Sequence, residues 1–96
     1  MKPSESLKIH REDIRRVVAQ NRARNPRVFG SVIHGHDHDD SDLDLLVDPT
    51  QETTLFDLAR IQGNLQRLLG VAVDVKTPDS LPDKFRADVI QEAVPV

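Results

Sequence analysis

The sequence contains no cysteine, no tryptophan and no tyrosine among its 96 residues. Without cysteine the chain has no disulfides and no thiolate ligands, so a bound metal would have to be held by oxygen atoms and imidazole nitrogens. Three phenylalanines are the only aromatic residues, so the core must be aliphatic and a surface that stacks nucleic-acid bases is not expected. These absences direct attention to carboxylate and histidine chemistry.

Long hydrophobic runs are also absent, and no apolar signal core follows Lys2 at the amino terminus. We therefore expect a soluble protein of the cytoplasm, without a membrane partner. A chain of 96 residues suits one domain, residues 1–96, because two halves would each be too small to bury a useful core.

The net charge of -3 is unevenly distributed along the chain. Residues 1–29 carry eight Lys or Arg against three acids, whereas residues 30–96 carry five against thirteen. A basic segment beside an acidic site could attract a polyanion or an acidic protein, although solvated helix faces account for most such charges. The chain leaves no room for domains that grip template and primer, so we expect neither a polymerase nor a nucleic-acid partner.

The spacing of apolar residues predicts helices that alternate with short strands. Thr53 or Thr54 is expected to cap the second helix and Gly70 to end it, and Phe85 and Val89 of the last helix are expected to face the core. The order indicates an α/β (α+β) fold with a small mixed sheet flanked by helices. The predicted helices cover about 11–23, 54–69 and 82–93, and the predicted strands cover 27–29, 43–47 and 71–75.

Three aspartates lie in, or directly before, two of the predicted strands. Because side chains alternate along a strand, Asp42 and Asp44 point to one face while the intervening aliphatic residues point to the other. Asp74 is the only acid in the run VAVDV, and three carboxylates meet if the two strands are neighbours. Such like charges raise one another's pKa unless a cation neutralises them, and all-oxygen ligation favours Mg²⁺ or Mn²⁺. Alternatively, Asp74 lies at a strand edge and caps a turn.

Gly30 and Ser31 follow the predicted strand 27–29. A glycine there allows backbone N–H groups to approach a phosphate closely, more so if a short helix starts at Ser31. This pair is a weak signal alone and gains its meaning from the residues that follow.

Gly30-Ser31, ten further residues, Asp42-x-Asp44 and then Asp74 on a later strand together resemble the nucleotidyltransferases of the DNA polymerase β superfamily. More narrowly, RVFGSVIHGHDHDDSDLDLLVD resembles the minimal nucleotidyltransferase domains, small antitoxin-type proteins often paired with HEPN-domain toxins. The resemblance implies a polymerase β palm-like fold over nearly the whole chain.

The same resemblance implies a role for each motif residue. Gly30 and Ser31 would hold the triphosphate of ATP, Asp42 and Asp44 would bind one or two Mg²⁺ ions, and Asp74 would complete the metal site and help activate the attacking hydroxyl. The implied reaction transfers AMP from ATP to a hydroxyl, a tyrosine by similarity to the antitoxin members, of a partner HEPN toxin bound as a heteromer. These residue types suit nucleotidyl transfer, because cations fixed by carboxylates can stabilise the attacking and leaving oxygens.

The chain departs from the family pattern directly after Gly-Ser. Relatives commonly carry arginines there, whereas this chain has Val32, Ile33 and His34. Arginine is the preferred bidentate phosphate ligand, so its loss would weaken nucleotide affinity or mark a member that binds without catalysing. A protonated His34 would replace it only in part.

The loop between the two motifs contains His34, His36 and His38. Short histidine tracts chelate Zn²⁺ or Ni²⁺, but a solvated linker is the simpler interpretation of this loop and of its aspartates Asp37, Asp39 and Asp40. Three interpretations therefore remain open. They are a Mg²⁺-dependent nucleotidyltransferase acting on a partner protein, a non-catalytic antitoxin that neutralises its toxin by contact, and a transition-metal-binding protein.

Overall fold

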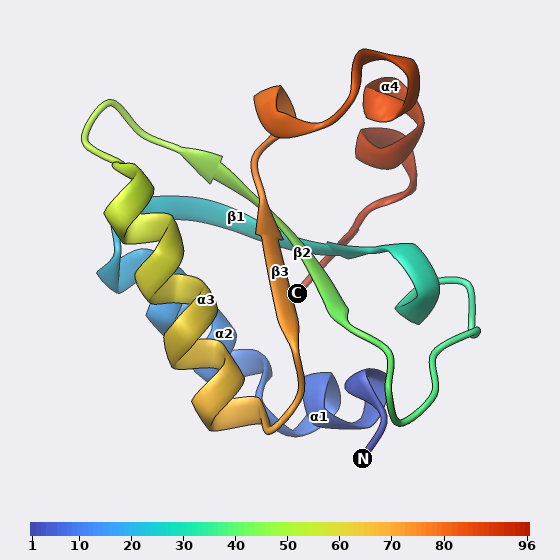
Figure 1. Cartoon of the computed structure of the whole chain (residues 1–96). Coiled ribbons are helices and arrows are strands. Elements are labelled where there is room, and N and C mark those ends of the chain that lie inside the picture. The colour runs from blue at the N-terminus through green and yellow to red at the C-terminus, as the bar shows by residue number, and fades with distance from the viewer.

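A computed structural model that describes residues 1–96 contains four helices and four strands (Figure 1). In chain order they are α1 (Pro3–Ile9), α2 (Arg11–Gln20), β1 (Ala23–Phe29), β2 (Leu43–Pro49), α3 (Leu55–Leu69), β3 (Val73–Lys76), α4 (Asp83–Glu92) and β4 (Val94–Pro95). Two short 3-10 turns, η1 (Gly30–Val32) and η2 (Pro78–Ser80), follow β1 and β3. None of the helices combines the length and apolar composition needed to cross a bilayer.

The strands form one sheet in the order β3-β2-β1-β4. β1 runs antiparallel to both β2 and β4, whereas β2 and β3 are parallel. A parallel pair needs a crossover connection, and α3 supplies it. The predicted α/β class with a small mixed sheet is therefore confirmed.

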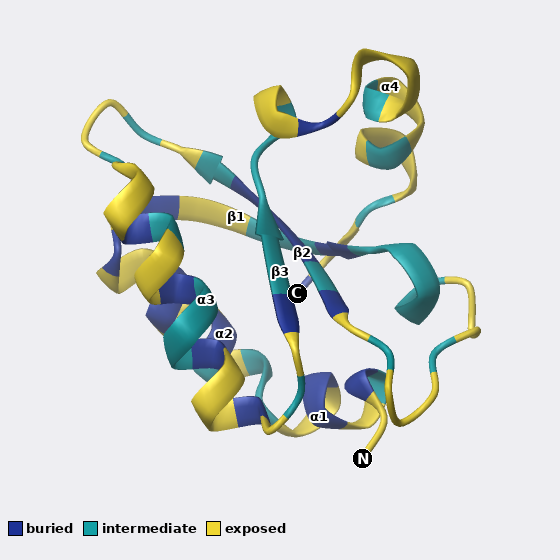
Figure 2. Cartoon of the chain, in the orientation of Figure 1, coloured by how far each residue is buried: buried dark blue, intermediate teal, exposed yellow.

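One face of the sheet is covered by α2 and α3 and holds the hydrophobic core, seen as the buried stretches in Figure 2. The aliphatic residues of β2 alternate as predicted, since Leu43, Leu45 and Val47 are fully buried against these helices. Leu46, on the opposite face, is also fully buried, and the turn η2 contacts β2 there. The segment that follows β3 thus covers part of the second face.

The predicted amino-terminal helix is too long at its carboxyl end. It ends at Gln20 instead of Ala23. Arg22, just before β1, has a positive φ angle of 62°, and Asn25, at the irregularity of β1 between Arg24 and Arg27, has one of 54°. The extra helix α1 was not predicted, because its seven residues bury too little apolar surface to give a helical pattern. Its Ser6 is nevertheless buried and donates a hydrogen bond from Oγ to the carbonyl oxygen of Leu69 at 2.7 Å.

The last helix does not face the core, so that prediction is wrong. Phe85 is 52% exposed and α4 has no buried residue, because α4 follows η2 onto the outer side of the sheet. The last residues form β4, which pairs with β1, and buried Val96 donates from its backbone nitrogen to the carbonyl oxygen of Pro26 at 3.0 Å.

Thr54 and the buried Asp57 form a reciprocal capping box at the start of α3. Of the two predicted caps Thr54 is the one used, and its hydroxyl accepts from the backbone nitrogen of Asp57 at 3.2 Å. The Asp57 carboxylate accepts in return from Thr54 and binds Arg22 and Arg60. The Arg22 guanidinium, followed by the Thr54 backbone, holds the pKa of Asp57 far below its ordinary value. Fully buried Asp57 thus joins the end of α2 to the start of α3.

We predict that Asp57→Asn lowers the melting temperature, because two arginines lose their charged partner. Since the folded-state pKa of Asp57 is depressed, its stabilisation is complete above the unfolded value of 3.8 and is lost as the pH falls below it. Thermal unfolding followed by circular dichroism should therefore show a gap between wild type and variant at pH 7 that narrows below about pH 4. Exposed Asp88→Asn is the control, and an equal loss there would contradict the assignment.

Candidate functional site

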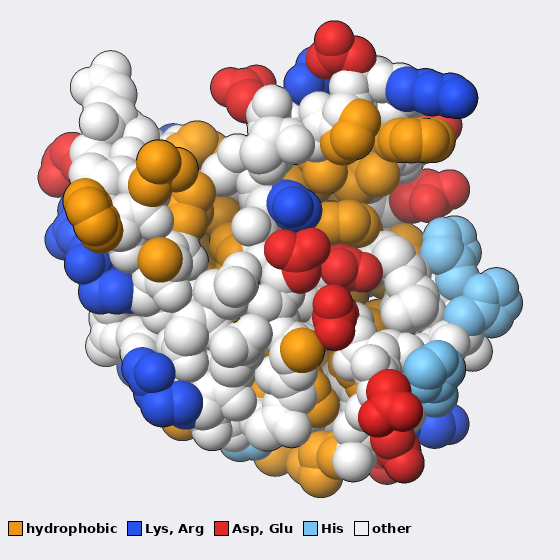
Figure 3. Space-filling view, viewed as in Figure 1, with side chains coloured by type: hydrophobic (Ala, Val, Ile, Leu, Met, Phe, Trp, Pro, Cys, Tyr) orange, Lys and Arg blue, Asp and Glu red, His pale blue; other side chains and the backbone are white.

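Neighbouring strands place three aspartates on the sheet face opposite the core. Asp44 of β2 lies in register with Asp74 of the parallel strand β3, and Asp42 precedes Asp44 by two residues and so points to the same side. Figure 3 shows acidic side chains gathered in the middle of this face, below the segment that leads into α4. The predicted strands are neighbours, and Asp74 is not turned away from the pair.

The charges in this cluster are poorly balanced. Burial, followed by the charges of Asp74 and Asp42, raises the pKa of Asp44 to about 6. The nearby ammonium group of Lys76 opposes that rise, and it lies 3.7 Å from Oδ1 of Asp74. Three carboxylates beside one lysine form a site that a divalent cation would stabilise, and their all-oxygen donor set suits Mg²⁺ or Mn²⁺.

Gly30 makes room for the Asp44 carboxylate. Phe29, the last residue of β1, lies in register with Asp44, so the turn that follows runs beside the acidic cluster. A Cβ atom on Gly30 would lie 2.3 Å from Oδ2 of Asp44, and the φ angle of Gly30 is +78°. Only glycine satisfies both conditions without strain or displacement. The glycine and the aspartate of the two motifs are therefore in direct steric contact.

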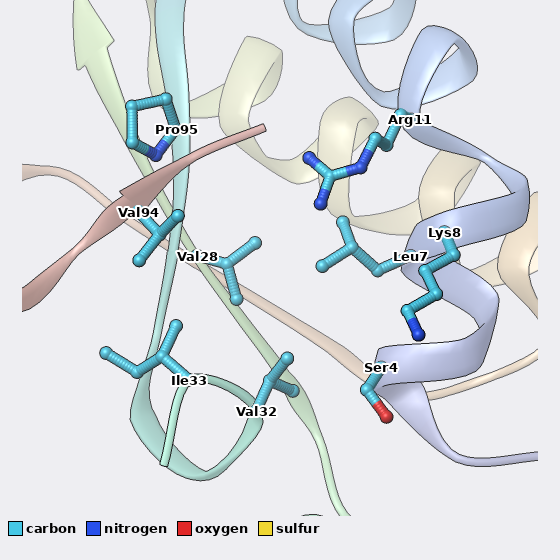
Figure 4. A pocket seen from close by; sticks show the side chains of 9 residues that line it. All are labelled: Ser4, Leu7, Lys8, Arg11, Val28, Val32, Ile33, Val94 and Pro95. Atoms are coloured by element: carbon cyan, nitrogen blue, oxygen red, sulfur yellow. The ribbon is translucent and has the colours of Figure 1, made fainter. Parts of the chain in front are cut away.

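The residues that replace the expected arginines take part in apolar packing. Ser31 lies within η1, and Val32 and Ile33 pack against the core. Both of these side chains line an apolar cavity of about 260 Å³ between α1, η1 and the β1–β4 pair (Figure 4). None of the three aspartates lines that cavity. Arginines at positions 32 and 33 in these orientations would point into apolar packing instead of towards a nucleotide.

The loop between the motifs makes a contact with α1 that a solvated linker would lack. Asp37 accepts from the backbone nitrogen of Ser4 at 2.9 Å, and this bond lowers the pKa of Asp37. The loop is thereby tied to the start of α1, and the linker interpretation is wrong for Asp37. Asp39 and Asp40 are exposed, as expected.

The three loop histidines are not gathered around a common point. Nε2 of His34 lies 3.3 Å from Oε2 of Glu92 at the end of α4, while His36 and His38 are exposed. No group of three or more histidine and carboxylate side chains stands close enough together to hold a metal ion as placed. This includes the aspartate cluster, where like charges oppose close approach.

Lys76 is the residue that the sequence interpretation missed. It is two positions beyond Asp74 on β3, so it shares the face of the carboxylates. The same alternation that grouped Asp42 with Asp44 could have identified it.

The family described as polymerase beta nucleotidyltransferase matches residues 12–96. The chain belongs to this family. The predicted nucleotidyltransferase identity is thus confirmed, as is the expected kind of enzyme. The protein adenylyltransferase MntA of Thermococcus cleftensis is 32% identical over 88 residues, which cover 92% of this chain and 86% of that protein.

Solved structures agree with this family assignment. A candidate minimal nucleotidyltransferase is 42% identical and superposes with a TM-score of 0.86, covering 97% of this chain and 95% of that chain. A crystal structure of a toxin-antitoxin with AMP-PNP superposes with a TM-score of 0.73 over 88% of this chain and 69% of that chain. At 20% identity the second likeness concerns the fold alone.

We predict that Gly30→Ala displaces the Asp44 carboxylate and destabilises the chain by about 1–2 kcal/mol or more through its positive φ angle. Gly35→Ala is a matched control, because Gly35 has a φ angle of +69° but no atom within 4 Å of its missing Cβ. Chemical denaturation should show a loss for both variants, while divalent-cation binding should fall only for Gly30→Ala. Equal binding by the two variants would contradict the role given to the close contact.

We predict that Asp44→Asn raises the melting temperature in metal-free buffer at pH 8. The folded state keeps the Asp44 proton up to about pH 6 while the unfolded chain releases it near 3.8, so wild-type stability falls as the pH rises between these values. Calorimetry should show a difference in melting temperature between variant and wild type that is complete above about pH 6 and disappears towards pH 4. Mg²⁺ should also reduce this difference at pH 8. A variant less stable than wild type at pH 8 would refute this prediction, and exposed Asp40→Asn is the control.

Proposed function

We propose that this chain transfers AMP from ATP to a hydroxyl group of a partner protein, with Mg²⁺ bound by Asp42, Asp44 and Asp74. The register of Asp44 with Asp74, in a member of the nucleotidyltransferase family, is the observation that carries the proposal. The relative from Thermococcus cleftensis that bears the name protein adenylyltransferase supports a protein as acceptor.

The side chains have distinct tasks in the proposed reaction. Asp42 and Asp44 would hold the metal, which neutralises phosphate charge when bound, and Gly30 and Ser31 would present N–H and hydroxyl groups to the triphosphate. The acceptor oxygen forms a bond to the α-phosphorus as the bond to pyrophosphate breaks. Pyrophosphate leaves with the electron pair, and the carboxylate of Asp74 takes the proton from the attacking hydroxyl.

The partner that we propose is a HEPN-family toxin, with a tyrosine as acceptor and the chain as its antitoxin in a heteromer. The sequence resemblance supports this choice, and the relative named protein adenylyltransferase supports a protein as the acceptor. Exposed apolar side chains at the start of α3 and on α4 lie on either side of the acidic cluster (Figure 3). They include Leu55, Phe56, Phe85 and Ile90. A protein surface fits such flanks better than a small acceptor does.

A second candidate is a non-catalytic antitoxin that neutralises its toxin by contact. The apolar packing of Val32 and Ile33, where relatives commonly carry arginines, favours this alternative. The two candidates share the partner and differ only in whether the aspartates are required.

The test is incubation of the chain with its toxin, Mg²⁺ and ATP labelled at the α-phosphate. We expect label on the toxin, and a loss of about a hundredfold or more for Asp42→Asn and Asp44→Asn, because each removes charge that stabilises the transition state. Asp88→Asn, exposed on α4, should transfer label normally.

The outcomes separate the two candidates. Absence of label with the wild-type chain would contradict the enzymatic proposal. If the Asn variants still protect cells from the toxin, antitoxin action is independent of transfer and the second candidate holds.

A further inference from the structure

The proposed nucleotide site is short of positive charge on the side of the Gly-Ser turn. Val32 and Ile33 are engaged in apolar packing, and His34 lies against Glu92. A triphosphate carries several negative charges, and proteins that bind it place a cation or N–H donors against them. The chain must therefore draw a cationic side chain from another element, or bind nucleotide weakly.

Two arginines on the outer side of the sheet are committed to the fold. Arg86 of α4 donates from Nε to the carbonyl oxygen of Pro78 at 2.9 Å and from Nη2 to that of Leu81 at 2.9 Å. Arg27 of β1 is only 12% exposed and binds Asp48. Both guanidinium groups hold segments of this chain together and are not available to a ligand.

Lys76 differs from these two arginines in its position and in the mobility of its side chain. Its ammonium group is 3.7 Å from Asp74, beyond direct hydrogen-bond distance, and its side chain is 42% exposed. Lys76 also borders an open cavity of about 370 Å³ between α3 and β3, so its flexible stem has room to move. It lies on the same face of the sheet as the carboxylates, two residues beyond Asp74 on β3.

We propose that Lys76 is the phosphate-binding cation of this site, released from Asp74 when a divalent cation occupies the carboxylates. This inference rests on the proposed nucleotide site. A metal ion bound to Asp44 and Asp74 repels the ammonium group, which the phosphate oxygens of a nucleoside triphosphate then attract. Lys76 thus neutralises the acidic cluster before binding and the polyphosphate after it.

The exchange makes two binding constants change in opposite directions. Lys76 competes with a metal for Asp74, so Lys76→Met should bind Mn²⁺ alone more tightly than wild type does. The same variant lacks a charged partner for the phosphates, so it should bind AMP-PNP in the presence of Mg²⁺ about tenfold more weakly. A lysine that only neutralised Asp74 would alter metal binding and leave the nucleotide dissociation constant, measured at saturating Mg²⁺, unchanged.

The test measures Mn²⁺ binding by electron paramagnetic resonance and AMP-PNP binding by calorimetry at saturating Mg²⁺. Lys76→Arg keeps the charge and should bind AMP-PNP within about threefold of wild type. Lys84→Met removes the same charge from α4, where Nζ lies 5.7 Å from the Phe85 ring centroid, and should change neither constant. Melting curves confirm that each variant is folded.

The outcomes distinguish this inference from the function on which it rests. If Lys76→Met binds AMP-PNP as tightly as wild type, or Mn²⁺ more weakly, the role of Lys76 is refuted while the aspartate site stands. If wild type binds neither Mn²⁺ nor AMP-PNP, the proposed function and the role of Lys76 fail together.

Discussion

The parallel pairing of β2 with β3 is the interaction on which the acidic site depends. It sets Asp44 beside Asp74 and, in the same register, Leu43 beside Val73 on the core face. A slip of one residue would move Asp74 into the core and the aliphatic residues of β3 to the surface. Because the crossover α3 buries its apolar stripe against this pair, core packing and the site's geometry enforce the same register.

Two carboxylates of this chain, one fully and one partly buried, have opposite electrostatic environments. Asp57 is fully buried, yet two arginines and the Thr54 backbone depress its pKa and make it a structural joint. Asp44 is less buried than Asp57, but burial, followed by its acidic neighbours, raises its pKa to about 6. Asp57 stabilises the folded chain as it stands, whereas the charge of Asp44 is opposed by its surroundings and would be stabilised by a bound cation. A carboxylate whose pKa is raised by burial and by like charges is typical of a functional site.

The edges of the sheet limit how a partner can approach. On the outer edge of β3 the backbone nitrogens of Val73 and Val75 donate to the side chains of Gln66 and Gln62 at 3.1 and 3.2 Å. Those glutamines of α3 close an edge that would otherwise accept another strand. A protein that presents a hydroxyl to the aspartates would therefore dock over the exposed side chains of α3 and α4 rather than extend the sheet.

Local patterns in the sequence determined the alternating strand of Leu43 to Val47, the helix capped by Thr54 and the grouping of Asp42 with Asp44, because each follows from periodicity or capping within a few residues. Together with the spacing between Gly30-Ser31 and the aspartates, these patterns were sufficient to predict the family. The tertiary structure alone decided the position of α4 off the core, the use of the last residues as β4, the tie from Asp37 to Ser4, and the contact between Gly30 and Asp44. These features join residues distant in sequence or depend on which surface an element covers. Local propensity carries no information about such choices, since they are settled by competition for burial and hydrogen bonds across the whole chain.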